Sequence, residues 1–122
     1  MKKILIVEDE PSYVKLLESQ LKHIYEILEA TDGKSGLALA KQEHPDLILL
    51  DIVLPVMDGM SVLAELRKDP VYGKNVKVIL LTNLETTDEI IYQVTDDLPV
   101  YYFIKSDVKL ADLISKIEAI LA

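Results

Sequence analysis

Short, continuous apolar runs alternate with longer amphipathic segments along the whole of this chain, and few folds are compatible with that order. Five apolar runs stand between turn residues, at 3–7, 25–30, 46–51, 76–82 and 100–105. A run without polar alternation is typical of a strand buried on both faces, as in a parallel sheet covered by helices. The run at 25–30 is weaker and more polar, which indicates an edge strand.

The segments that separate or follow these runs are expected to be helices. They cover residues 11–24, 33–43, 58–68, 86–95 and 107–121. Pro11 suits a first helical position, and Thr86 with Glu89 fits a capping box. Strict alternation of strand and helix predicts right-handed crossovers and an open, doubly wound α/β sheet with five helices. Five units are too few for an eight-stranded barrel.

Composition excludes several classes of protein. A chain of 122 residues fits a single domain, 1–122, and its net charge of −8 argues against direct binding to nucleic acid or to an anionic membrane. The absence of cysteine excludes disulfides and thiolate metal sites. The apolar run near the N-terminus is too short for a signal peptide, and no stretch approaches the length of a membrane span. We therefore expect a cytoplasmic protein.

The ends of the predicted strands carry the polar residues from which a site could be built. In an open α/β sheet, ligands bind outside the carboxyl ends of the strands. Glu8 and Asp9 follow the first run, and Asp51, Thr82 and Lys105 end the third, fourth and fifth runs. If these four strands are neighbours, three carboxylates, a hydroxyl and an ammonium share one crevice.

Such a crevice suits a metal ion and a phosphoryl group. Three carboxylates at one place repel one another, and the pKa of at least one would rise unless a cation were bound. Ligands that are all oxygen favour a hard ion, Mg²⁺ or also Mn²⁺. The ion and Lys105 could attract one phosphate oxygen, and Thr82 could donate a hydrogen bond to another. Asp51, at the centre, is then the candidate nucleophile for phosphoryl transfer.

In this order along the chain, these motifs resemble the receiver domain of two-component response regulators, and the resemblance covers the whole sequence. It is carried by Glu8, Asp9, the stretch DIVLPVMDG that begins at Asp51, Thr82, and Lys105 with Tyr102 three positions before it. The resemblance implies a flavodoxin-like fold with strand order 2-1-3-4-5.

The resemblance also implies the roles of the acidic residues. Asp51 would accept a phosphoryl group from the phosphohistidine of a histidine kinase or a histidine phosphotransfer domain. Asp9, Asp51 and the backbone carbonyl of Val53 would ligate Mg²⁺, and Glu8 would act mainly through a metal-bound water. The aspartyl phosphate would form and hydrolyse in a self-catalysed cycle, so the protein is not expected to be an enzyme in the turnover sense.

The remaining family residues would form a switch. Lys105 would contact a phosphoryl oxygen, Thr82 would move toward the phosphoryl group, and Tyr102 would rotate inward behind it. This pair would reshape the face of the fourth helix, fifth strand and fifth helix for a downstream protein or output domain. We expect a monomer or a weak dimer, either a stand-alone receiver or part of a longer protein.

Three positions depart from the family pattern. Ser106 stands where a proline after a cis peptide is common, and both a trans and a strained cis bond remain open, since a non-proline cis bond costs about 2.5–4 kcal/mol. Asn83 is larger than the usual alanine or glycine, which predicts narrower access and an altered phosphoryl lifetime. The stretch DDLPV at 96–100 replaces a glycine before the fifth strand.

Other interpretations remain open at this point. The chain could be a receiver-like module that binds partners without phosphorylation. It could also be a small Mg²⁺-dependent phosphotransferase or phosphatase, although no second acid lies two residues after Asp51, or a flavin-binding domain, although the acidic stretch after the first strand would repel a phosphate.

Single residues have simpler interpretations beside the functional ones. Glu8 and Asp9 could cap the first helix. Asp58 with Gly59 is expected to form a turn and cap for the third helix. His23 and His44 are expected at the surface and not as ligands.

Overall fold

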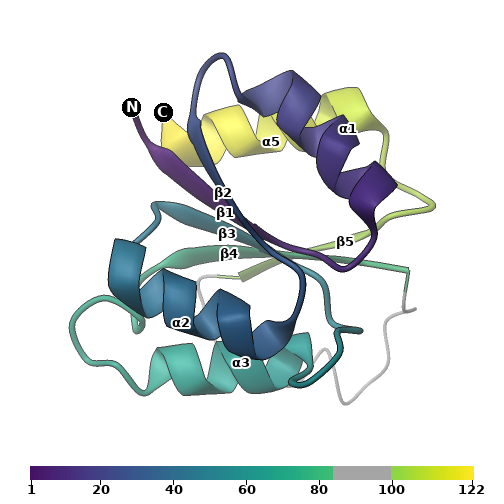
Figure 1. The fold of residues 1–122 in the computed structure, drawn as a ribbon. Helices are drawn as coiled ribbons and strands as arrows, with labels where there is room; N and C mark the ends of the chain where they lie inside the picture. Colours follow the sequence, from purple (N-terminus) through teal and green to yellow (C-terminus); the bar gives the residue numbers. More distant parts are fainter. Residues whose placement is uncertain (84–99) are drawn as a thin grey trace.

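The computed structural model describes residues 1–83 and 100–122, which form one parallel sheet with helices on both faces (Figure 1). The elements are β1 (Lys3–Val7), α1 (Pro11–Leu21), β2 (Glu26–Ala30), α2 (Gly33–Glu43), β3 (Leu47–Leu50), α3 (Gly59–Arg67), β4 (Lys77–Thr82), β5 (Val100–Ile104) and α5 (Leu110–Leu121). Four of the five predicted helices are thus observed. The fifth, predicted over 86–95, lies outside the described residues, as does most of the stretch DDLPV.

The five strands are parallel and follow the order β2-β1-β3-β4-β5, which confirms the predicted order. The chain winds outward from β1 to the edge strand β2, then crosses to β3 and continues in the other direction. The topological switch therefore falls between β1 and β3, where open α/β sheets bind ligands. The edge strand β2 carries the exposed acids Glu26 and Glu29, which protect an edge from pairing with another strand.

Two apolar layers explain why the strands show no polar alternation. Successive strand side chains point to opposite faces of the sheet. Ile4 and Ile6 of β1 pack in the layer with α1 and α5, whereas Leu5 and Val7 pack in the layer with α2 and α3. Figure 1 shows the same pairing of helices on the two sides of the sheet. The central strands are therefore apolar at every position except the strand ends, where β1 begins with Lys3 and β4 runs from Lys77 to Thr82.

The ends of the helices differ by a few residues from the predicted ones, for local reasons. α1 begins at Pro11 as predicted but ends at Leu21, because the chain turns back toward β2 with the Tyr25 N–H donating to the Leu21 carbonyl. α5 begins at Leu110 and not at 107, because the turn after β5 comes first. α3 begins after Asp58, whose side chain accepts a hydrogen bond from the Ser61 N–H at 2.9 Å. This contact confirms the turn-and-cap interpretation of Asp58.

The two termini lie near each other, at the end of the sheet opposite the carboxyl ends of the strands (Figure 1). Lys2 and Ala122 line the same surface hollow there. Within residues 1–83 and 100–122, no helix is both long enough and apolar enough to cross a membrane.

Candidate functional site

The hydrogen-bond ladder of the sheet places the predicted site residues at one edge. Beyond the last residue of each strand, the Asp51 N–H donates to the Val7 carbonyl at 3.1 Å, and the Lys105 N–H donates to the Thr82 carbonyl at 2.8 Å. The Glu8 N–H donates to the carbonyl of Ala30 on β2. Because the ladder extends past the strands, the backbones of Glu8, Asp51 and Lys105 are hydrogen-bonded to their neighbouring strands.

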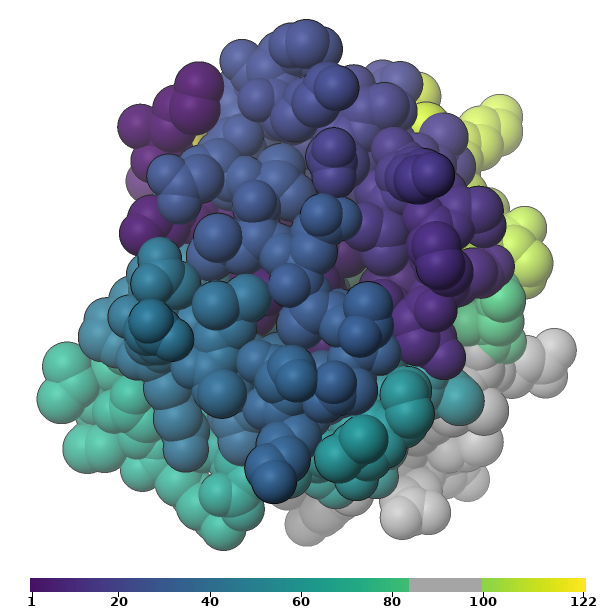
Figure 2. Space-filling view, viewed as in Figure 1, coloured from purple at the N-terminus to yellow at the C-terminus, as the bar shows by residue number. Residues whose placement is uncertain are grey.

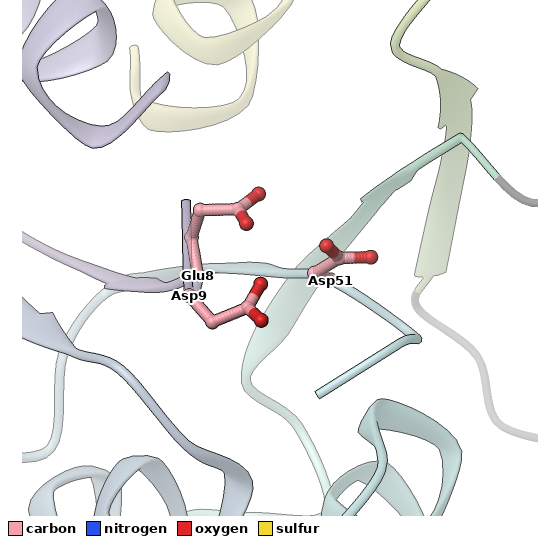
Figure 3. Close-up of side chains that lie close together, drawn as sticks. All are labelled: Glu8, Asp9 and Asp51. Carbon is pink, nitrogen blue, oxygen red and sulfur yellow. The ribbon is translucent and has the colours of Figure 1, made fainter. Parts of the chain in front are cut away.

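The side chains of Glu8, Asp9 and Asp51 lie close together (Figure 3). One oxygen of each lies within 4.8 Å of the others. Glu8 and Asp51 are only 4% and 7% exposed, whereas Asp9 lies at the surface. Among the described residues, the polar or charged residues that are buried as whole residues are Glu8, Asp51 and Thr82, and all three were predicted site residues. A buried carboxylate is costly unless it is paired, so this cluster requires compensating charge.

Lys105 supplies part of that charge. Its side chain is 7% exposed, and its Nζ donates hydrogen bonds to Glu8 and to Oδ2 of Asp51, the latter at 3.2 Å. The backbone N–H groups of Glu10 and Val53 donate to the other oxygens, Oε2 of Glu8 and Oδ1 of Asp51, at 3.1 and 3.2 Å. Both buried carboxylates are thereby held in fixed orientations.

The pKa values of this cluster reflect the competition between burial and pairing. Burial raises the pKa of Glu8, and the negative charge of Asp51 adds to the rise, while the bond from Lys105 opposes it. Burial acts to lower the pKa of Lys105, but its bonds to Glu8 and the charge of Asp51 outweigh burial and raise that pKa. Sequence analysis predicted that repulsion between the carboxylates would raise the pKa of at least one of them. The pKa of Glu8 is raised, but burial is the larger cause and the charge of Asp51 the smaller one.

The acids border a cleft of about 390 Å³ at the carboxyl edge of the sheet. It is lined by Glu8, Asp9, Glu10, Asp51, Val53, Thr82, Asn83 and Lys105. Mg²⁺ binds oxygens at about 2.1 Å, so two of its ligands lie at most about 4 Å apart. Small side-chain movements would bring three carboxylates that are already within 4.8 Å to that spacing. The donor set, which is all oxygen with one nearby ammonium, fits a hard divalent cation and a phosphoryl group.

The loop after Asp51 is held against the site by a close backbone approach. The Gly59 N–H donates to the Ile52 carbonyl at 2.8 Å. A Cβ atom at Gly59 would overlap with the carbonyl oxygen of Asp51 and with Cα of Ile52. Only glycine therefore allows α3 to begin this close to the acid. In the same loop Val56 has φ of 70°, a left-handed conformation that a β-branched residue rarely adopts.

The predicted switch residues lie on adjacent strands. Thr82 ends β4 and is 1% exposed. Tyr102 of β5 pairs in register with Leu80 and packs in the layer with α3, whereas Tyr101 and Phe103 pack in the layer with α1 and α5. All three aromatic residues therefore belong partly to the core. Movement of Thr82 and Tyr102 stays a prediction.

Sequence analysis missed Glu10, which lines the cleft, and Tyr13, which contacts Lys105, and one interpretation was wrong. The ring of Tyr13, in the first turn of α1, lies beneath Lys105, with 4.6 Å between Nζ and the ring centroid. The available signal was an aromatic residue one helical turn after the acidic pair. The N-cap of α1 is Glu10, with no side-chain capping bond, so Glu8 and Asp9 do not cap that helix.

His23 and His44 are exposed, as predicted, and His44 stacks on Tyr72 far from the acids, with ring centroids 4.4 Å apart.

A groove of about 650 Å³ lies between α1 and α2, on the face of the molecule that Figure 2 shows. Its lining is mostly apolar and includes neither Asp51 nor Lys105. The chemistry of the acidic cleft therefore identifies the cleft, and not the larger groove, as the candidate site.

Comparison with known proteins agrees with this geometry. The family model of the response regulator receiver domain matches residues 4–118. The chain therefore belongs to the receiver domains of two-component response regulators. It is 38% identical over 91 residues to Protein PilH of Pseudomonas aeruginosa, a match that covers 74% of this chain and 75% of PilH.

Other relatives are longer. The probable transcriptional regulator ycf27 of Porphyridium aerugineum is 40% identical over 88 residues, which cover 71% of this chain but 35% of that protein. This chain thus spans about a third of the length of that relative.

Solved receiver structures have the same fold. The BeF3-activated receiver domain of Klebsiella pneumoniae RstA is 30% identical, with a TM-score of 0.83 over 98% of each chain. The receiver domain of a Pseudomonas aeruginosa sensor histidine kinase is 28% identical, with a TM-score of 0.83 over 99% of this chain and 98% of that one. That structure is described with a magnesium ion coordinated in the active-site cleft.

Proposed function

We propose that this domain accepts a phosphoryl group on Asp51 from the phosphohistidine of a histidine kinase or a histidine phosphotransfer domain. The observation that carries the proposal is the environment of Asp51. Its carboxylate is buried, lies 3.2 Å from the Lys105 ammonium, and shares one cleft with Glu8 and Asp9. Membership of the receiver family supports this role, and so does the description of the related RstA domain as BeF3-activated.

Asp51, Lys105 and Val53 would have different roles in the phosphoryl transfer. An oxygen of Asp51 attacks phosphorus, so that an O–P bond forms while the P–N bond of the phosphohistidine breaks. The imidazole leaves with the electron pair and takes up a proton. The Lys105 ammonium reduces the repulsion between the anionic acceptor and the anionic donor. The Val53 N–H, which donates to Oδ1 of Asp51, keeps the carboxylate oriented during the attack.

The same cleft would hold Mg²⁺, or Mn²⁺ in its place. Asp9, Asp51 and the backbone carbonyl of Val53 would be ligands, and Glu8 would act mainly through a bound water. A bound divalent ion neutralises charge on the group being transferred. The support is the set of three carboxylates within 4.8 Å and the magnesium ion described in the cleft of the related Pseudomonas aeruginosa domain.

Phosphorylation would act on partners through Thr82 and Tyr102. These residues would reshape the face of β5 and α5 together with the predicted fourth helix, which lies outside the described residues. A downstream protein or an output domain would bind that face. The phosphoryl group would leave by self-catalysed hydrolysis, without enzymatic turnover of a separate substrate. A cytoplasmic location and a monomeric or weakly dimeric state remain predictions.

The first test is the intact mass of the protein after incubation with acetyl phosphate and Mg²⁺. We expect one added phosphoryl group in the wild type and none after chelation of the metal. Asp51→Asn should abolish the adduct. Asp112→Asn, which neutralises an exposed acid on α5, is the matched control and should leave the adduct unchanged.

The outcomes separate this proposal from its alternatives. An adduct that persists in Asp51→Asn would place the acceptor elsewhere. If neither acetyl phosphate nor beryllofluoride modified or bound the wild type, the domain would act by binding without phosphorylation. Steady release of phosphate from a small phosphate ester, with dependence on Asp51, would instead favour a phosphatase.

A further inference from the structure

Lys105 contacts an aromatic ring as well as the two carboxylates. Its Nζ lies 4.6 Å from the centroid of the Tyr13 ring while it donates to Glu8 and Asp51. Tyr13 belongs to the first turn of α1, and Lys105 follows β5. The contact therefore joins two segments far apart in the sequence at the cation of the site.

We propose that Tyr13 is a positioning residue for Lys105: its ring face holds the ammonium beside Asp51 and thereby speeds phosphoryl transfer. This inference rests on the proposed function, because the role of Tyr13 is defined by the reaction of Asp51. Tyr13 is not among the residues that line the acidic cleft, so it acts through Lys105 and not on the phosphodonor.

The physical basis is the attraction between a cation and the negative face of an aromatic ring. Lysine carries its charge on a flexible four-carbon stem, which must be restricted if the ammonium is to stay at one place. During the transfer, Lys105 has to exchange a contact with a carboxylate for one with a phosphoryl oxygen. The ring contact can persist through this exchange, since it involves neither Glu8 nor Asp51.

The chain contains a second pair of the same kind, which serves as a control. Lys116 of α5 lies over the ring of Tyr101, with 4.5 Å between Nζ and the centroid. Neither residue lines the acidic cleft. Tyr101→Leu therefore removes a comparable contact and a comparable apolar ring without touching the site.

The contact itself is tested by NMR of the Lys105 side chain, without any phosphodonor. Protons above a ring face resonate upfield of their usual position. We expect an upfield shift of the methylene protons next to Nζ in the wild type and in Tyr13→Phe, and its loss in Tyr13→Leu. An unchanged Lys105 spectrum in Tyr13→Leu would show that the ring does not lie under the ammonium, and the proposal would be wrong.

The functional role is tested by the rate at which acetyl phosphate and Mg²⁺ phosphorylate Asp51, followed by intact mass. A cation–π contact of ordinary strength predicts a rate about three- to tenfold lower in Tyr13→Leu. Tyr13→Phe keeps the ring and should retain the wild-type rate, and so should Tyr101→Leu. Equal slowing in Tyr13→Leu and Tyr101→Leu would indicate a general loss of packing and would contradict the proposal.

A series of fluorinated phenylalanines in place of Tyr13 separates electrostatics from shape, and it remains informative if Tyr13→Leu folds poorly. Fluorine withdraws electrons from the ring face while the ring keeps its shape and burial. We expect the phosphorylation rate to fall as fluorine is added, whereas a purely structural role predicts a constant rate. If the wild type is never phosphorylated, the proposed function fails and this role fails with it. If the wild type is phosphorylated but the series is flat, only the role of Tyr13 is wrong.

Discussion

The left-handed backbone at Val56 allows a quantitative prediction about stability. Among the described residues other than glycine, positive φ occurs at His44 and Val56. Valine, which is β-branched, adopts positive φ less readily than histidine does. The left-handed conformation costs an ordinary residue about 1–2 kcal/mol, and this cost is lower for asparagine. Val56 lies in the loop between Asp51 and α3, and backbone strain is common in loops that form functional sites.

Replacing Val56 by asparagine should therefore stabilise the fold. Val56 is 78% exposed, so the substitution gives up little apolar burial, about 0.5 kcal/mol at most. Relief of the strain exceeds this loss, and we expect a net gain of about 1 kcal/mol in the free energy of unfolding. A gain of that size raises the thermal midpoint of a domain of this length by about 4 °C. With a typical denaturant slope it moves the urea midpoint by about 0.5 M.

The assay is urea denaturation followed by far-ultraviolet circular dichroism, because the chain has no tryptophan. Val71→Asn is the matched control, since Val71 is 82% exposed and does not have positive φ. It should leave the urea midpoint unchanged or lower it slightly. If the two variants shift the midpoint equally, Val56 is not strained and the argument from its backbone conformation fails.

Two further predictions concern the site loop and the far end of the sheet. Gly59→Ala should lower the free energy of unfolding by about 1–3 kcal/mol, because its Cβ meets backbone atoms. It should also slow phosphorylation of Asp51. In Gly36→Ala the three atoms nearest to the new Cβ belong to the side chain of Val7 and not to backbone, so urea denaturation should show a smaller loss; equal losses would contradict the steric argument. Burial raises the pKa of Tyr72 above the value of about 10 that tyrosine has in an unfolded chain. The folded state then keeps a proton that the unfolded state loses, so stability is full below about pH 10 and falls as the pH rises further. Tyr72→Phe, which also removes the hydrogen bond to the Pro45 carbonyl, should lower stability at pH 8 by about 1 kcal/mol. It should make the fall in the urea midpoint above pH 10 shallower; an unchanged fall would refute the assignment.

The parts of the fold that sequence analysis predicted are those with a local signal. A strand buried on both faces needs apolar residues at every position, and Leu47–Leu50 meets that requirement in full. The helix over Gly33–Glu43 was predicted to the residue, and Asp32 caps it. The ends of α1 and α5 were less accurate, because hydrogen bonds of the following or preceding turn, and not the apolar pattern, decide where a helix ends.

Most of the candidate site was also predictable, for a reason of topology. In a parallel sheet every strand delivers its last residue to the same edge, so Glu8, Asp51 and Thr82 could be assigned to one cleft. Their roles in phosphoryl transfer follow from the family and stay proposals. The interpretation of Glu8 and Asp9 as caps of α1 was wrong, because Glu10 is the N-cap residue. Acidic residues before a helix are only a weak indicator of which of them is the N-cap.

The sequence alone determined the class of fold, the edge of the sheet that carries the chemistry, and the residues that meet there. It could do so because apolar periodicity and polar strand ends are patterns among residues that are close together in the sequence. Only the tertiary structure decided how those residues pair. Lys105 bonds to Glu8, which is 97 positions away, and lies over the ring of Tyr13 in the first turn of α1. Such contacts depend on how helices pack against the sheet to within an ångström or so. The spacing of residues along the chain does not specify the packing of helices on the sheet. The partner of a buried charge such as Lys105 is therefore known only from the tertiary structure.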